Sequence, residues 1–150
     1  MKLFGRAYLE AFIAFAILDG IWLSLIASDF YVEHLGYIMR EQVIWPAAIA
    51  FYFLYIAGVV YLVSVPAALR NNWKKAGING AVLGLVGYGT YDLTNYATLE
   101  GWPFIVLAVD LVWGAFVSSI IALGGFMGAR RYIDAQRMKK AAAAAPYKDY

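Results

Sequence analysis

The sequence predicts an all-α membrane protein, a bundle of four transmembrane helices with both termini in the cytoplasm. Two observations support this fold class. Of the 150 residues, 63% are hydrophobic and only 15% are charged, whereas an average soluble domain has about 25% charged residues. The charges also leave four long stretches that each hold at most one charged residue. Each stretch provides the roughly 20 apolar residues that a helix needs to cross the hydrocarbon core.

The four predicted helices cover about residues 8–28, 43–64, 77–99 and 103–127. Residues 1–129 then form the transmembrane domain, and residues 130–150 form a basic cytoplasmic tail that first extends the last helix. The apolar runs are continuous, which favours helices over the alternating short strands of a barrel. A very short turn at residues 100–103 predicts that the last two helices are antiparallel neighbours. Residues 29–41 are expected to form an exposed loop along the outer interface.

The basic residues predict the orientation. All of the 12 Lys and Arg residues except Arg40 lie before the first helix, between the second and third, or after the fourth. The positive-inside rule therefore places both termini in the cytoplasm. Trp45 and Trp102 are expected at the outer interface and Trp73 at the inner one. The basic tail is expected to attract anionic lipid headgroups, with a solvated stop-transfer segment as the alternative.

Composition and motifs also exclude several function classes. A soluble globular domain, a disordered chain and a nucleic-acid binder do not have this composition. The absence of cysteine excludes disulfides, cysteine-ligated metals and thiol catalysis. With His34 as the one histidine, the pattern predicts no metal site, and no phosphate-binding or dinucleotide motif is present. The sequence therefore assigns no catalytic residue and leaves any cofactor unknown.

Three carboxylates interrupt the predicted membrane spans. Asp19, Asp92 and Asp110 lie eight to ten residues from Asp29 or Glu100, which at the rise of a helix is roughly 12–15 Å below the outer flank. Ionisable groups inside a membrane are rare and costly. Because these residues share one depth, we expect the polar faces of the helices to point at one another.

Helical spacing places aromatic and polar side chains beside these carboxylates, and Tyr52 on the second helix lies at a similar depth. The candidate ligand-binding residues are Asp19, Trp22, Tyr52, Tyr55, Tyr88, Tyr91, Asp92, Asn95, Asp110 and Trp113. No Lys, Arg or His is available at that depth, so protonation, a bound cation or hydrogen bonds must neutralise the carboxylates. Three roles remain open: a polar cluster that sets helix register, a pocket for a cation, lipid headgroup or small polar molecule, or a partner interface.

A stripe of small residues runs next to the polar face of the third predicted helix. It consists of Gly77, Gly80, Gly84 and Gly87. Such stripes let two helix backbones approach closely in lipid, where small residues replace the packing of larger side chains. We therefore expect the third helix to pack against a neighbour through these glycines.

At these motifs the chain resembles the bacterial membrane proteins of the domain-of-unknown-function 2177 family. The resemblance covers about residues 8–128 and excludes the tail. The segments that carry it are Asp19–Leu23 (DGIWL), Trp45–Ala48 (WPAA), Tyr88–Asn95 (YGTYDLTN), Trp102–Pro103 and Asp110–Gly114 (DLVWG). The resemblance implies a multi-pass protein of four helices in a bacterial inner membrane, and it implies no activity.

Two classes of function therefore remain. The first is a site in the bundle that binds, or acts on, a cation, a lipid headgroup or a small polar molecule at the three aspartates. The second is a non-catalytic accessory or scaffolding subunit of a larger inner-membrane complex. The carboxylates at one depth favour the first, whereas the short chain and small loops favour the second.

Overall fold

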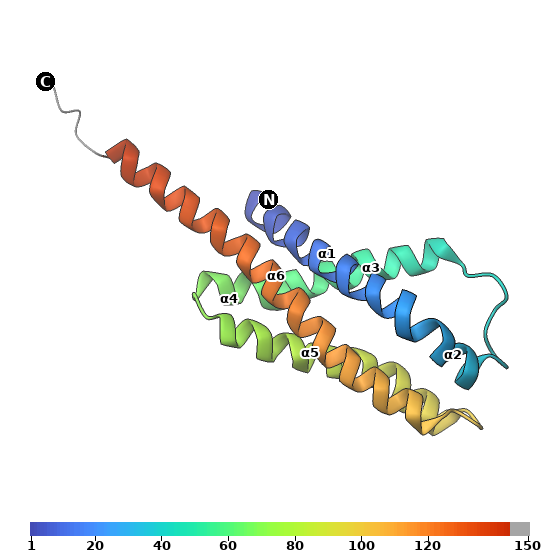
Figure 1. Ribbon diagram of the computed structural model, residues 1–150. Helices are drawn as coiled ribbons and strands as arrows, with labels where there is room; N and C mark the ends of the chain where they lie inside the picture. The colour runs from blue at the N-terminus through green and yellow to red at the C-terminus, as the bar shows by residue number, and fades with distance from the viewer. Residues whose placement is uncertain (145–150) are drawn as a thin grey trace, which may run out of the picture.

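The computed structural model of the protein describes residues 1–144, and every regular element among them is helical. The first helical stretch contains α1 (Lys2–Trp22), a π-helical turn η1 (Leu23–Ala27) and α2 (Ser28–Leu35). The second contains α3 (Trp45–Val59), a π-helical turn η2 (Val60–Ser64) and α4 (Val65–Leu69). The helices α5 (Trp73–Thr98) and α6 (Phe104–Ala144) follow. The four stretches form an elongated bundle (Figure 1).

Three of the four stretches are long and apolar enough to cross a membrane: Lys2–Leu35, Trp45–Leu69 and Phe104–Ala144. The helix α5 has a sufficient length of 26 residues, but its polar residues and glycines make it less apolar, and it is not among the three. The prediction of an all-helical membrane bundle is thus confirmed. That α5 also spans the membrane stays a prediction, which its packing against α6 supports.

The helix bounds differ from the predicted ones mainly at the ends. The first stretch begins at Lys2 and the last continues to Ala144. The tail therefore extends the last helix, as predicted, as far as Ala144. Residues 145–150 lie outside the described part of the chain. Both the N-terminus and the far end of α6 lie at the same end of the bundle (Figure 1). The α4–α5 turn also lies at this end. We call it the basic end because Arg70 lies in this turn and Lys74 and Lys75 lie in the first turn of α5.

The prediction of a loop over residues 29–41 is wrong for residues 29–35, which form most of α2. The helix forms because one of its faces is apolar and has a surface to cover. Leu35 packs in a small core with Trp102 and Val106, and Phe30 and Tyr31 lie against the same core. Trp102 is only 6% exposed, because α2 covers it; its predicted level at the outer membrane interface stays a prediction.

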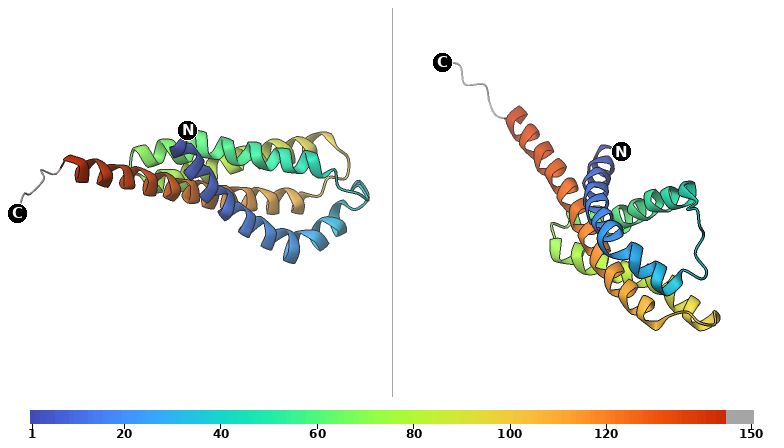
Figure 2. Two further views of the ribbon diagram at one scale, coloured as in Figure 1. Left: turned by 90° about the horizontal axis from the view of Figure 1, so that it is seen from above. Right: turned by 45° about the vertical axis from the view of Figure 1, so that its right-hand side comes forward.

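A π-helical turn interrupts each of the first two stretches. In η1, the Ser24 hydroxyl donates a hydrogen bond to the Gly20 carbonyl at 2.6 Å, a bond that competes with the helix ladder and bends helices. The turn η2 lies just before Pro66. Because proline has no backbone N–H, it cannot donate the hydrogen bond that an α-helix would place there. Figure 2 shows that α1 runs away from its neighbours and that α2 then turns back towards them.

The centre of the bundle is α6, which packs against α1 and α5 along much of its length. Fully buried Ala7 and Ala11 on α1 permit one close approach, and Gly80 and Gly84 on α5 permit the other. A Cβ atom at Gly84 would overlap the Gly114 carbonyl on α6, and one at Gly80 would lie 2.7 Å from the Ala122 Cβ. The predicted packing of the third helix is therefore confirmed for Gly80 and Gly84, whereas Gly87 faces Tyr55 of α3 and is exposed.

The turn between α5 and α6 depends on Gly101, whose φ of +82° is unfavourable for residues with a Cβ. The Tyr37 hydroxyl donates a hydrogen bond to the Gly101 carbonyl at 2.9 Å. This bond ties the loop of residues 36–44 to the turn. The predicted antiparallel arrangement of the last two helices is confirmed by this turn and by the extensive α5–α6 contact.

Candidate functional site

The three aspartates lie on three different helices, and all are buried. Asp19 on α1 is 9% exposed, Asp92 on α5 is fully buried and Asp110 on α6 is 6% exposed. None of them takes part in a salt bridge among residues 1–144, where the two ion pairs join Arg130 to Asp134 and Arg131 to Glu10. The carboxylates are therefore surrounded by aromatic hydroxyls and indoles rather than by cations.

Asp110 accepts a hydrogen bond from the hydroxyl of Tyr31, which comes from α2. The bend at η1 makes this contact possible because it turns α2 back over the start of α6. Trp22, at the end of α1, lies beside the Tyr31 side chain and stacks on Trp113 of α6, with ring centroids 4.3 Å apart. This part of the site thus joins the first helical stretch to α6.

Asp19 lies beside Tyr52 of α3, whose ring packs against Phe15 at a centroid distance of 4.9 Å. Tyr88 of α5 lies near both Asp19 and Asp110, and so connects the two carboxylates. Its ring covers the Cα of Gly114, where an added Cβ would overlap the ring. A glycine at this position is therefore required for the central tyrosine to reach the middle of the bundle.

Asp92 has the least satisfied carboxylate. Neither of its oxygens has a hydrogen-bond partner among residues 1–144, and the same holds for the indole Nε1 of Trp102. Asp92 lies near Asp110 and faces Trp102. Buried polar atoms are normally paired because an unpaired one costs free energy. This cluster therefore holds unused hydrogen-bonding capacity close to a second carboxylate.

The remaining predicted residues lie beside the three carboxylates and their aromatic neighbours. Tyr55 shares a hydrogen bond of 2.6 Å with the buried Ser118 hydroxyl on α6. Tyr91 and Asn95 lie next to one another on α5, and Tyr91 meets the edge of Trp102 at a centroid distance of 5.5 Å. Contacts between neighbouring side chains thus connect the ten predicted residues, which we call the aromatic layer.

A cleft of about 360 Å³ opens between α3 and α5 beside this layer. Its walls are Phe51, Tyr55, Gly87, Tyr88 and Tyr91. The cleft exists because α3 makes few contacts with α5 at this level and because Gly87 carries no side chain. Tyr88 has one side on the cleft and lies near Asp19 and Asp110, while Tyr91 lies near Asp92. The carboxylates therefore lie behind an aromatic wall.

The geometry limits the kinds of ligand that fit. Within residues 1–144, no three His, Asp or Glu side chains come close enough to hold a metal ion together. The carboxylates lie behind the aromatic wall of the cleft. Such a wall attracts positively charged groups through the ring quadrupole. The walls that a ligand in this cleft would meet are therefore mainly aromatic.

Sequence reasoning missed Tyr31 and Trp102 as parts of this layer. Tyr31 was assigned to a loop because charged residues flank it. The signal that identifies it is the spacing of Ala27, Tyr31 and Leu35, which is one apolar residue per helical turn. Trp102 is predicted at the outer membrane interface, and nothing in its spacing indicates that α2 covers it.

The comparisons with known proteins agree with this architecture. A family model described as "Predicted membrane protein (DUF2177)" matches residues 4–127. No curated protein and no solved structure matches the chain. The matched region contains the three aspartates, the cleft and Tyr31, and it ends before the extension of α6.

Proposed function

Because the chain belongs to the DUF2177 family of predicted membrane proteins, we propose that its function is carried out within the bundle: it binds a small organic cation in the cleft between α3 and α5. The observation that supports this most directly is the charge balance of the layer. Three buried carboxylates have no cationic side chain as an ion-pair partner among the described residues. A positively charged guest is one way to neutralise these carboxylates, beside protonation and hydrogen bonds.

The walls of the cleft support the same ligand class. Aromatic rings attract a cation that lies over their faces, and the attraction increases when the site is desolvated. Tyr55, Tyr88 and Tyr91 provide such rings. A quaternary or protonated amine is small enough for a volume of about 360 Å³, and its apolar surface suits the aromatic wall better than that of a hydrated inorganic ion.

Long-range attraction from the carboxylates supports binding without direct contact. In a medium of low dielectric constant, two charges several ångströms apart interact far more strongly than in water. Asp19 and Asp110 lie near Tyr88, and Asp92 lies near Tyr91. When the carboxylates are ionised, their combined potential favours a cation over a neutral ligand of the same size and disfavours an anion.

The test is titration calorimetry on the full chain in detergent with tetramethylammonium as the probe. The neutral near-isostere tert-butanol and the sodium ion serve as comparison ligands. We expect saturable binding of tetramethylammonium and weaker binding of both comparison ligands. Equal binding of tert-butanol would show that the cleft selects by shape alone and would overturn the charge argument.

Two pairs of variants locate the binding. Asp19→Asn and Asp92→Asn each remove one buried carboxylate and should weaken binding about tenfold, whereas Asp29→Asn, on the exposed surface of α2, should not. Gly87→Leu fills the cleft and should abolish binding, whereas Gly58→Leu, a glycine with open space around it, should not. Binding that survives Gly87→Leu would exclude the cleft as the site. No binding by the unaltered chain would favour the alternative of an accessory subunit without a ligand.

A further inference from the structure

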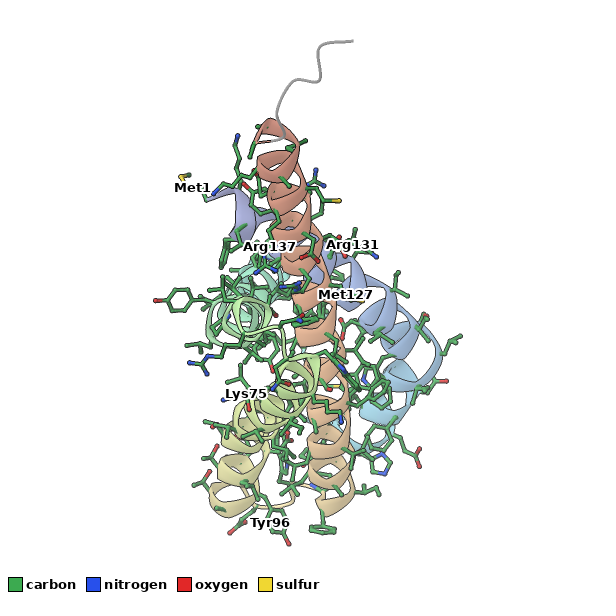
Figure 3. The ribbon with its side chains drawn as sticks, turned by 90° about the vertical axis from the view of Figure 1, so that its left-hand side faces the viewer. Met1, Lys75, Tyr96, Met127, Arg131 and Arg137 are labelled. Atoms are coloured by element: carbon green, nitrogen blue, oxygen red, sulfur yellow. The ribbon has the colours of Figure 1, made fainter. Side chains whose placement is uncertain are left out.

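A second cavity lies far from the aromatic layer, at the basic end of the bundle. It is a groove of about 710 Å³ between the first turns of α1 and the extension of α6. Figure 3 shows Met1, Arg131 and Arg137 gathered at this end, with Tyr96 at the opposite end of the bundle. The groove is thus separate from the cleft, and the proposal made for it here is independent of the one above.

The polar lining of the groove is mainly basic. Lys2 and Arg6 come from α1, while Arg131 and Lys139 come from α6. The one acidic residue in the lining is Glu10, and its carboxylate accepts a hydrogen bond from Arg131 at 2.8 Å. Among residues 1–144, the other three basic residues have no ion-pair partner. The groove therefore has a surplus of positive charge.

Close packing of α1 on α6 shapes the floor of the groove. A Cβ at Gly128 would lie 2.6 Å from the Arg6 carbonyl, so this glycine lets the two helices touch. Gly5 also lines the groove and has open space in front of it. A bulky anionic group can therefore approach the backbone near the start of α1. The positive end of the dipole of this 21-residue helix adds to the attraction.

The position of the groove decides between a lipid and a soluble anion. Along α1 the lining begins with Lys2 and Arg6 and ends with Leu9 and Glu10, of which Leu9 is apolar. Beyond this point, α1 presents exposed apolar side chains such as Ile13 and Ile17, which are 48% and 58% exposed. A ligand that fits this gradient has a negatively charged head and an apolar tail. An anionic phospholipid has that structure.

We propose that this groove binds the headgroup of an anionic phospholipid, with the phosphate near Lys2, Arg6 and Lys139 and the acyl chains along the apolar surface of α1. The contact of Glu10 with Arg131 holds the two helices together at the level of the headgroup. Each basic residue near a membrane surface contributes to attraction of anionic lipid. Here the basic residues come from two helices and converge on one cavity, which makes the attraction site-specific.

The experiment is native mass spectrometry of the full chain released from detergent micelles. The probes are dioleoylphosphatidylglycerol and dioleoylphosphatidylcholine, which share their acyl chains and differ in headgroup charge. We expect one molecule of phosphatidylglycerol to bind at least tenfold more tightly than phosphatidylcholine. Equal affinity for the two lipids would overturn the proposal without any variant being made.

Variants then assign the binding to the groove. The double variant Lys2→Gln/Arg6→Gln should weaken phosphatidylglycerol binding about tenfold. The matched control Lys74→Gln/Lys75→Gln removes two positive charges from the same end of the bundle but from outside the groove, and it should change affinity less than twofold. An equal loss in both double variants would show that net charge, not the groove, attracts the lipid. Displacement of the lipid by millimolar inorganic phosphate would show that the site takes a soluble phosphate, and would also overturn the proposal.

Discussion

Tyr31 donates a hydrogen bond to the carboxylate of Asp110, although the two residues are 79 positions apart in the sequence. The bond fastens α2 to the start of α6 and closes the bundle over the aromatic layer. The bend at η1 directs α2 to this contact, and the small core around Leu35 and Trp102 holds it there.

Replacing Tyr31 with Phe should destabilise the protein. The change removes one donor from a buried carboxylate and keeps nearly the same volume, so the expected loss is about 1–3 kcal/mol in the free energy of unfolding. Thermal unfolding in detergent measures it. Tyr61→Phe is the control because Tyr61 is 69% exposed. If the two variants had the same midpoint, the bond between Tyr31 and Asp110 would contribute nothing to stability.

Replacing Gly84 with Ala should also destabilise the protein, because the new Cβ would overlap the Gly114 carbonyl and force α5 away from α6. Overpacking of this kind costs about 1–3 kcal/mol. Gly58→Ala is the matched control, since nothing lies within 4 Å of the position of its Cβ and alanine favours helix by up to about 1 kcal/mol. The midpoints of thermal unfolding should therefore shift in opposite directions. A stable Gly84→Ala variant would contradict the close helix contact.

Replacing Asp92 with Asn should leave the folded protein as stable as before or more stable. The carboxylate is fully buried and its oxygens have no partner among the described residues, so removal of its charge eliminates a desolvation cost. Asp29→Asn on the exposed surface should change stability by less than about 0.5 kcal/mol. A loss above about 1 kcal/mol in the unfolding measurement would show instead that a bound cation or proton donor stabilises the carboxylate in the unaltered protein.

Labelling with a membrane-impermeant thiol reagent tests the orientation. The chain contains no cysteine, so a single cysteine at Glu33 or at Lys139 reports on one end of the bundle. The distribution of basic residues predicts that Glu33→Cys reacts in intact cells and that Lys139→Cys reacts only after the membrane is opened. Reaction of Lys139→Cys in intact cells would reverse the predicted topology.

Several features of the site could be predicted from the sequence because they follow from local spacing. The burial of Asp19, Asp92 and Asp110 follows from the cost of exposing a carboxylate to lipid, and the burial of Gly80 and Gly84 follows from the small-residue stripe. The contact between Tyr31 and Asp110 could not be predicted in this way, since it depends on a bend in one helix and on a bond between distant segments. The same applies to Trp102, which is buried only because α2 lies over it.

The fold class and the number of long helices follow from the order of apolar and charged residues along the chain. Lipid requires every backbone group to be paired within a helix, so apolar runs of sufficient length specify helices whatever surrounds them. The order of residues does not specify which polar groups meet, where the cleft opens between α3 and α5, or that α1 and α6 form a basic groove. These features depend on crossing angles and on the bend before α2, which arise from side-chain packing between residues far apart in the chain.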